Sequence, residues 1–312
     1  MNRYEQAMRC FCDTSAFTLN NPEYKKLVDW YLFEEMERDS GAGDLTTQLC
    51  LKGKSLQKTA VIRAKGLGIF VGEMEISYFL DTLSLAYRWH VQDGDLVAAH
   101  QILLEITGDA AILMRTERVI LNLIGRLSGI ATLTAQCVHK VPENVLVCPT
   151  RKTLWGLLDK RACVAGGGGG THRLHASSAA LIKENHWALF PNRDIALLKP
   201  ILENASIEAL GRFVDIEVEN ANEAHAAVDA LSALPQGVQG VIMFDNFSPE
   251  IITPLVAELK SKNDSILFEA SGGIILENIA AYGKTGVDIL SLGALTHSVI
   301  PLDVSMRIFS VL

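Results

Sequence analysis

The sequence predicts an α/β protein in which a small α+β layer precedes an α/β barrel. The main observation is a series of short, nearly all-apolar runs that recur between helical segments after about residue 145. A second is that polar residues follow these runs at regular intervals. The chain has 312 residues, 49% of them hydrophobic and 21% charged, so it can bury a large core without disulfides or structural metals.

The first half of the chain predicts a mixed layer of helices and short strands. Residues 1–20 are polar and mixed, and we expect a loosely attached extension there. Apolar residues at helical spacing predict helices over 24–37 and 110–138, and a glycine-rich turn covers 41–47. Strand patterns occupy the remaining segments of this half, at 59–63, 68–71, 84–90 and 102–107.

The second half predicts parallel strands that are buried on both faces. The apolar runs lie at 145–148, 180–182, 213–218, 240–244, 266–270 and 288–292. Glu219, Asp245, Ser271 and Gly293 follow four of these runs, at intervals of 26, 26 and 22 residues. Each interval fits one strand, one loop and one helix, and polar groups at strand ends form the active sites of α/β barrels. Doubly wound sheets share this rule, so the spacing favours a barrel without excluding that alternative.

Composition argues against several classes of partner. The net charge is −8 and the pI is about 5.5, which disfavours nucleic acid or a membrane surface as a partner. The apolar stretch at 110–124 is interrupted by Arg115, Glu117 and Arg118, and the N-terminus shows no secretory pattern. The six cysteines form no zinc pattern and are expected to be reduced thiols. We expect a cytoplasmic protein.

Five basic residues are expected at one barrel mouth, although the chain as a whole is acidic. They are Arg151, Lys152, His172, Arg173 and Lys183. Like charges that are brought together repel unless an anion relieves them, so this cluster predicts a multiply negative ligand. Arginine suits planar carboxylates and phosphates through its paired donors, whereas lysine acts as a compact point charge.

Two carboxylates are expected opposite the basic cluster. Glu219 and Asp245 end neighbouring strands, where they could hold Mg²⁺, bind ribose hydroxyls or stabilise a cationic transition state. Simple pairing with the basic residues is the alternative role. Glu217 lies two residues before Glu219, so on a continuous strand it would share the same face and compete for the role.

Glycine-rich loops follow the last two predicted strands, at 271–273 and 292–294. Glycine lets backbone N–H groups approach an anion, and the last two strand ends of barrels commonly bind phosphate. The five glycines at 166–170 fit neither a P-loop nor a dinucleotide motif, and we interpret them as a turn.

Nine motifs resemble those of the quinolinate phosphoribosyltransferase family, in family order over about residues 25–310. They are GDLTT (43–47), ERVILNLIGRLSGIAT (117–132), TRKT (150–153), GGGGTHR (167–173), LIKENH (181–186), IEVEN (216–220), FDN (244–246), EASGGI (269–274) and GVDILSLGALTHS (286–298). The resemblance implies an N-terminal α/β sandwich at 25–120, completed by about 298–312, after an extension at 1–24. It also implies a seven-stranded α/β barrel, TIM-like, at 121–297.

The resemblance also implies a reaction and a set of roles. Quinolinate and phosphoribosyl pyrophosphate would give nicotinate mononucleotide, pyrophosphate and CO₂ with Mg²⁺, a glycosyltransferase step of NAD biosynthesis. The residues implied to hold the quinolinate carboxylates are Arg118, Arg151, His172 and Arg173. Lys152 and Lys183 are implied to lie between quinolinate and the pyrophosphate. Glu219 and Asp245 are implied to face the ribose and its metal. Those implied to receive the 5′-phosphate are Ser271, Gly272, Gly293 and His297.

In this family the arginine matching Arg118 comes from the partner subunit, so the resemblance implies a homodimer and leaves higher assembly open. The sequence departs from the family pattern at 174–179, where His175 replaces a common glycine, and at Pro149, where aspartate is usual. These departures leave substrate selectivity open.

Three alternative functions remain at this point. One is the related molybdenum-operon pyrophosphorylase, although that group usually lacks the pattern Lys183-Glu184-Asn185-His186. Another is a Schiff-base lyase that uses Lys183. A third is a non-catalytic binder of phosphate ligands, which would have no need of the two carboxylates.

Overall fold

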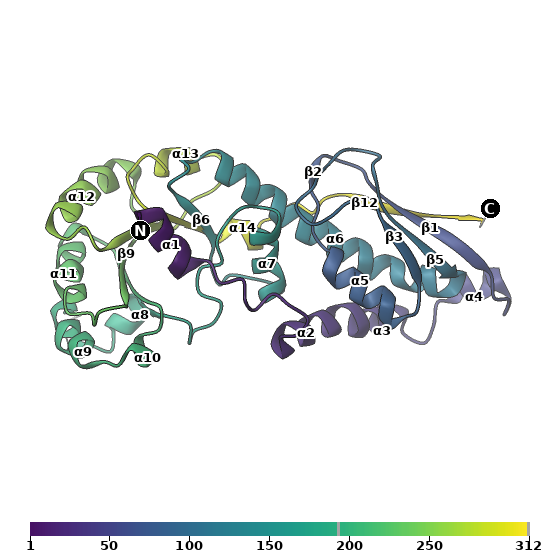
Figure 1. Cartoon of the computed structure of the whole chain (residues 1–312), viewed down its shortest axis with the longest axis horizontal. Coiled ribbons are helices and arrows are strands. Elements are labelled where there is room, and N and C mark those ends of the chain that lie inside the picture. Colours follow the sequence, from purple (N-terminus) through teal and green to yellow (C-terminus); the bar gives the residue numbers. More distant parts are fainter. Residues whose placement is uncertain (192–193, 311–312) are drawn as a thin grey trace. The chain divides into compact units, whose positions relative to one another are not determined.

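The structure is a computed structural model that describes residues 1–191 and 194–310. The chain divides into two compact units (Figure 1). Unit 1 contains residues 1–14, 136–153 and 169–298, and unit 2 contains 15–135, 154–168 and the segment from 299 onward. The predicted boundary near residue 120 falls inside the helix α6 (Ala110–His139), which the two units share.

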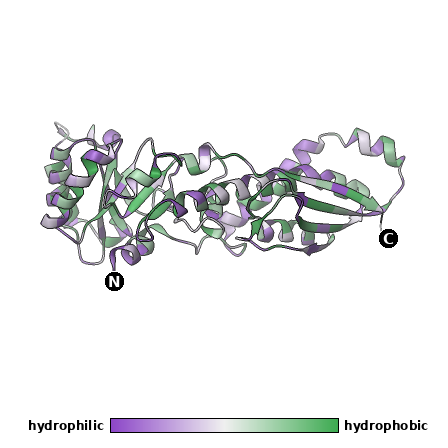
Figure 2. Ribbon diagram, turned by 90° about the horizontal axis from the view of Figure 1, so that it is seen from above, coloured by the Kyte–Doolittle hydropathy of each residue, from purple (hydrophilic) through white to green (hydrophobic). Residues whose placement is uncertain are grey.

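Unit 1 is built on a parallel sheet with the strand order β6-β11-β10-β9-β8-β7. The strands are β6 (Leu146–Pro149), β7 (Ala180–Ile182), β8 (Phe213–Val218), β9 (Gln239–Asp245), β10 (Leu267–Ser271) and β11 (Ile289–Leu292). They agree within a residue or two with the apolar runs of the sequence. Most of their side chains are buried, as expected for strands covered on both faces, and Figure 2 colours them largely as hydrophobic.

Helices and loops connect these strands. The helices are α8 (Glu184–Trp187), α9 (Leu198–Asn204), α10 (Ile207–Leu210), α11 (Ala221–Leu231), α12 (Pro249–Lys262), α13 (Ile279–Tyr282) and α14 (Ala294–His297), with a 3₁₀ turn at Ile195–Leu197. The α/β class and the barrel-like sheet are therefore confirmed.

The described residues form six parallel strands in unit 1 rather than the seven that the resemblance implies. Residues 169–173 run beside β6, where the Gly170 N–H donates to the Val147 carbonyl at 2.8 Å. The next two N–H groups, of Thr171 and His172, both donate to the carbonyl of Phe11 instead of to a strand. A left-handed backbone at His172, with φ of 53°, also interrupts an extended conformation there.

The N-terminal helix α1 (Arg3–Phe11) is part of unit 1 and is not a loose extension. Its Ala7, Cys10 and Phe11 are buried against the first residues of the parallel strands, and Figure 1 shows it beside β6. A capping box between Asn2 and Glu5 closes the start of the helix. The sequence reasoning underestimated this segment because its apolar residues are few, yet they lie on one face of a helix.

Unit 2 contains an antiparallel sheet with the order β12-β1-β5-β3. Its strands are β1 (Gln57–Ala64), β3 (Ala86–Trp89), β5 (Ile102–Asp109) and β12 (Val304–Ser310), beside a ribbon of β2 (Gly68–Ile69) and β4 (Leu96–Val97). The helices are α2 (Pro22–Asp29), α3 (Glu35–Ser40), α4 (Leu45–Leu51), α5 (Glu73–Thr82) and α7 (Leu157–Ala165), with a π-helix at Trp30–Glu34. The end of the chain thus returns as β12 to pair with β1.

Among the described residues, α6 is the one helix that is long and apolar enough to cross a membrane. It contains 30 residues, and 67% of its most apolar window is buried inside the protein. Such burial is typical of the core helix of a soluble protein.

Candidate active site

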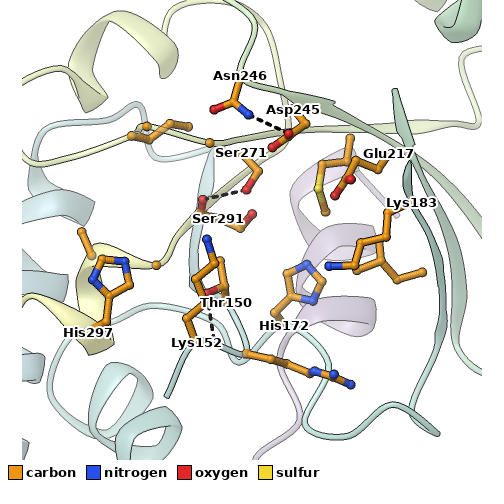
Figure 3. A pocket seen from close by; sticks show the side chains of 18 of the residues that line it. Thr150, Lys152, His172, Lys183, Glu217, Asp245, Asn246, Ser271, Ser291 and His297 are labelled. Atoms are coloured by element: carbon orange, nitrogen blue, oxygen red, sulfur yellow. Dashed lines mark hydrogen bonds between the residues drawn. The ribbon is translucent and has the colours of Figure 1, made fainter. Parts of the chain in front are cut away.

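A cavity of about 660 Å³ opens at the carboxyl ends of the strands of unit 1 (Figure 3). All of the residues that line it belong to that unit. It brings together most of the site residues expected from the sequence, namely Arg151, Lys152, His172, Arg173, Lys183, Asp245, Ser271, Gly272, Gly293 and His297.

Strand alternation explains how the sheet builds this site. Every second side chain along a strand lies on the same face, and three such positions follow one another from the core to the cavity. On β8, Phe213 packs in the core at the start of the strand, Asp215 is buried in the middle, and Glu217 lines the cavity. On β10, Leu267 packs in that same core and Ser271 lines the cavity. The period of two puts these residues on one face, and their types make its lower level apolar and its upper level polar.

The basic wall of the cavity comes from three segments. Arg151 and Lys152 follow β6, Arg173 follows the His172 corner, and Lys183 follows β7. Burial, together with the neighbouring positive charge of Arg151, lowers the pKa of Arg173. Its Nε atom is buried and has no hydrogen-bond partner among the described residues. This wall therefore offers donors and positive charge to an anion.

Two carboxylates, Glu217 and Asp245, face the cavity from neighbouring strands. Burial raises the pKa of Glu217, and the negative charge of Asp245 raises it further, while Lys183 lowers it. Burial also raises the pKa of Asp245, against the hydrogen bond from Asn246 and the positive charge of Lys152. The Asn246 Nδ2 donates to the Asp245 Oδ2 at 2.7 Å (Figure 3). Both carboxylates would gain from a nearby cation.

Glu219 is placed differently from the sequence expectation. Strand β8 ends at Val218, so Glu219 no longer follows the alternation that would have put it on the face of Glu217. Its side chain is exposed and outside the lining of the cavity, and its backbone N–H donates to the Glu223 Oε2 at 2.8 Å. Of the two carboxylates at this strand end, the structure therefore places Glu217 in the cavity.

His172 lines the cavity and belongs to a buried cluster with Asp215 and Glu269, which lie behind the cavity lining. One ring nitrogen of His172 and one carboxylate oxygen of each acid all lie within 4.8 Å of one another. The Arg173 N–H donates to the His172 Nδ1 at 2.8 Å, so this nitrogen is unprotonated and Nε2 carries the hydrogen. His172 Nε2 lies 3.2 Å from Glu269 Oε1, which also accepts from the Ser291 hydroxyl. Both ring nitrogens of His172 are thus engaged within the protein.

The two acids of this cluster favour their protonated forms. Burial raises the pKa of Glu269 to about 8, against the hydrogen bond from the Ser291 hydroxyl and the positive charge of Arg173. Burial and the negative charge of Glu269 raise the pKa of Asp215 well above its ordinary range. A proton held here reduces the negative charge beneath the basic wall, so the acids oppose anion binding less than two carboxylates would.

The loops after β10 and β11 form the remaining side of the cavity. Gly272 and Gly273 have φ of 85° and 63°, a left-handed conformation that favours glycine. A Cβ on Gly272 would also collide with Asn246, and one on Gly293 would lie 2.8 Å from the His297 Nε2. The backbone here can approach a bound group closely, as phosphate loops require.

Arg118 is the one substrate-binding residue predicted from the sequence that lies in unit 2. It is exposed on α6 and lines a second cavity, of about 480 Å³, with neighbours that include Asn122, Arg126 and Trp155. Within unit 2 the Arg126 guanidinium is bound by Asp159, with Nε–Oδ1 at 2.8 Å. The structure of one chain therefore does not group Arg118 with the other predicted site residues.

Sequence reasoning missed several residues of the site. Asp215 and Glu269 received no role, although a single acid inside an apolar run, in phase with a strand-end site residue, was a usable signal. Thr150 and Asn246 also line the cavity and lay inside motifs already noticed. Ser291 lay inside the motif at 286–298, but a serine within a buried strand is otherwise unremarkable in sequence.

Taken together, the parallel sheet and its strand-end cavity define an α/β protein with a site for a ligand that carries several negative charges. Comparison with family models identifies the family of this protein. The model described as "Quinolinate phosphoribosyl transferase, N-terminal domain" matches residues 44–128, and the model of the corresponding C-terminal domain matches residues 130–307. The chain belongs to the quinolinate phosphoribosyltransferase family, and it is an enzyme of the pentosyltransferase type.

Individual relatives agree with this membership. The chain is 40% identical over 297 residues to a probable nicotinate-nucleotide pyrophosphorylase (carboxylating) of Bacillus subtilis, covering 93% of this chain and 95% of that protein. It is 31% identical to the nicotinate-nucleotide pyrophosphorylase (carboxylating) of Rattus norvegicus, covering 80% and 82%. The solved nicotinate-nucleotide pyrophosphorylase of Francisella tularensis matches with a TM-score of 0.76 at 29% identity, covering 91% and 96%.

Proposed function

We propose that the protein transfers the phosphoribosyl group of phosphoribosyl pyrophosphate to quinolinate, with loss of CO₂, to form nicotinate mononucleotide and pyrophosphate. The observation that carries the proposal is one cavity with a basic wall, two carboxylates and two glycine loops. These groups match a dicarboxylate, a ribosyl cation and phosphates. The 30–40% identity to curated pyrophosphorylases over most of the chain supports the same reaction.

The basic wall would bind the planar dicarboxylate. Arg151 and Arg173 offer paired donors that suit carboxylates, and the buried Arg173 Nε has an unused donor among the described residues. Lys152 and Lys183 line the same cavity as compact charges, suited to the oxygens of the departing pyrophosphate. The Thr296 hydroxyl donates to the Lys152 carbonyl at 2.7 Å and so ties the lysine loop to α14.

The two carboxylates would stabilise the reacting sugar. Breaking the bond between ribose and pyrophosphate builds positive charge on the ribose carbon, and Glu217 and Asp245 face the cavity where that charge would develop. After the ring nitrogen of quinolinate has bonded to the ribose, the positive charge of the pyridinium stabilises the electron pair that the departing CO₂ leaves on the adjacent ring carbon, and a proton from water then completes nicotinate mononucleotide. No side chain has to form a covalent intermediate.

The acidic side of the cavity also fits Mg²⁺. Carboxylate oxygens beside a phosphate site are the ligands that Mg²⁺ prefers, and burial raises the pKa of both Asp245 and Glu217, so a cation would favour their ionised forms. Asp245 and Glu217 are the residues we propose to hold it, and Glu219 remains a candidate through water. Mg²⁺ would neutralise charge on the pyrophosphate oxygens.

We further propose that the protein works in the cytoplasm as a homodimer whose partner subunit supplies Arg118 to the site. The resemblance to the family supports this assignment, and the exposure of Arg118 on α6 leaves it accessible to a second chain. His172 remains a proposed carboxylate ligand, although both of its ring nitrogens are engaged within the chain.

The test is an assay of pyrophosphate release and of CO₂ from carboxyl-labelled quinolinate, with purified protein, phosphoribosyl pyrophosphate and Mg²⁺. We expect nicotinate mononucleotide as the product. Nicotinate lacks the second carboxylate and should react much more slowly, because it leaves buried guanidinium donors unpaired. Equal or faster turnover of nicotinate would rule out the proposed substrate.

A further inference from the structure

The end of the N-terminal helix touches the side chain of a proposed substrate-binding residue. The ring of Phe11 meets the ring of His172 edge to face, with centroids 4.8 Å apart and an interplanar angle of 84°. Phe11 also stacks on Phe213 at the start of β8, with centroids 4.3 Å apart, and the His172 and Phe213 rings contact each other with centroids 6.0 Å apart. Phe11 is fully buried, so its ring fills the space beneath His172.

The backbone of Phe11 holds the same corner of the chain. Its carbonyl accepts the N–H of Thr171 at 2.7 Å, the N–H of His172 at 2.8 Å and the hydroxyl of Thr171 at 3.0 Å. The Asp13 N–H in turn donates to the Thr171 hydroxyl oxygen at 3.0 Å. Residues 11–13 therefore provide hydrogen bonds that a neighbouring strand would otherwise supply.

The corner needs such support because its conformation is unusual. His172 has a φ of 53°, which few residues other than glycine adopt unless their surroundings enforce it. The next N–H, of Arg173, donates to the His172 Nδ1 at 2.8 Å, so this hydrogen bond links the histidine ring to the arginine backbone. The Arg173 guanidinium is also held beside the like charge of Arg151.

Helix α1 is anchored firmly enough to act as this support. The Arg3 guanidinium binds Asp288 through Nε at 2.8 Å and Nη2 at 2.7 Å, and donates to the Ile266 carbonyl at 2.6 Å. These contacts join the start of the helix to the segments that enter β10 and β11.

We propose that Phe11 is a positioning residue, and that the N-terminal helix holds the His172–Arg173 corner in the conformation that binds the dicarboxylate. The proposal rests on the proposed function. It gives residues 11–13, at the end of the helix, a role in the site of unit 1, although they contribute no group to the cavity itself.

Hydrogen exchange tests the contact independently of activity. In the full-length protein, the amides of Thr171 and His172 should be protected, because both donate to the Phe11 carbonyl. Phe11→Ala and the milder Phe11→Leu should speed their exchange at least tenfold, while amides of β9 and β10 stay protected. Tyr4→Ala is the matched control, since Tyr4 is a partly buried aromatic residue on the same helix and packs on the same core.

Steady-state kinetics test the consequence. We expect both Phe11 variants to raise the KM for quinolinate, by about tenfold or more for Phe11→Ala, since small misplacements of a binding group cost up to about a hundredfold. The KM for phosphoribosyl pyrophosphate should stay within twofold, and Phe11→Leu should restore part of the loss. Tyr4→Ala should change neither the KM for quinolinate nor the KM for phosphoribosyl pyrophosphate. If Phe11→Ala does not fold, Phe11→Leu and Phe11→Met provide the same comparison.

The two proposals fail in different ways. A wild-type protein that does not turn over quinolinate would refute the proposed function before any variant is made. With an active wild type, the positioning role would be refuted if folded Phe11 variants changed both KM values together or changed neither. It would also be refuted if Tyr4→Ala gave the same selective effect.

Discussion

Replacing Glu269 with glutamine should change how the stability of the protein depends on pH. Glu269 is fully buried beside Asp215, and burial raises its pKa from the ordinary 4.5 to about 8. Between these two values the folded protein keeps a proton that the unfolded chain releases. The free energy of unfolding therefore falls as the pH rises from about 4.5 to about 8.

The size of the effect follows from the number of protons involved. One proton retained only by the folded state corresponds to a loss of roughly 1 kcal/mol per pH unit within that window. Glutamine keeps a carbonyl oxygen for the Ser291 hydroxyl and the His172 Nε2–H but has no proton to release. We expect Glu269→Gln to be within about 1 kcal/mol of wild type at pH 5. Its free energy of unfolding should then rise relative to that of wild type by roughly 1 kcal/mol for each pH unit up to pH 8.

Urea unfolding at pH 5, 6, 7 and 8 measures this difference directly, with the slope of each transition checked for constancy. Glu203→Gln, on an exposed position of α9, is the control and should run parallel to wild type. The groups that face Glu269 are His172, Asp215, Arg173 and Ser291, and all are present in both proteins. A stability difference that stays flat between pH 5 and pH 8, or shrinks as pH rises, would refute the reasoning.

Three further predictions concern other parts of the chain. Glu217→Gln should lower kcat by roughly 10²–10³ with a smaller effect on the quinolinate KM, because the proposed function puts the Glu217 charge beside the reacting sugar. Glu219→Gln should stay close to wild type, and the reverse order would return the role to Glu219. Arg118→Ala and Lys183→Ala homodimers should each be nearly inactive. Random exchange of subunits between the two variants should make about half of the dimers mixed, and since each mixed dimer has one intact site, about a quarter of all sites should be active. Verified mixed dimers without recovery would place Arg118 outside a shared site. Arg161→Met should destabilise unit 2 by about 3–5 kcal/mol in thermal unfolding, because Arg161 Nε lies 3.2 Å from Oε1 of Glu75, whose carboxylate is fully buried. A loss below about 1 kcal/mol would contradict this prediction.

The strands and the location of the site could be predicted because both depend on local patterns. Short apolar runs such as 213–218 and 240–244 are typical of strands covered on both faces, and β8 and β9 correspond to them closely. Strand ends of a parallel sheet meet at one edge, so Lys183, Asp245 and Ser271 reach one cavity although they are far apart in sequence.

The N-terminal segment was misjudged for the opposite reason. Its composition is polar, and nothing local indicates that Ala7, Cys10 and Phe11 would find a core formed by residues more than a hundred positions away. The same holds for Asp215 and Glu269, since their proximity depends on the pairing of β8, β9 and β10 and on the inward direction of both side chains.

By itself, the sequence determined the α/β class, the strands and the set of charged and glycine residues available at their ends, because periodicity and residue chemistry are local properties. The tertiary structure alone decided that β8 ends at Val218 and so places Glu217 in the cavity. It also decided that the carbonyl of Phe11 takes the hydrogen bonds of Thr171 and His172, which leaves six strands in the described sheet. The physical reason is that strand ends, hydrogen-bond partners and buried acid pairs are set by contacts between distant segments, whose energies no short stretch of sequence contains.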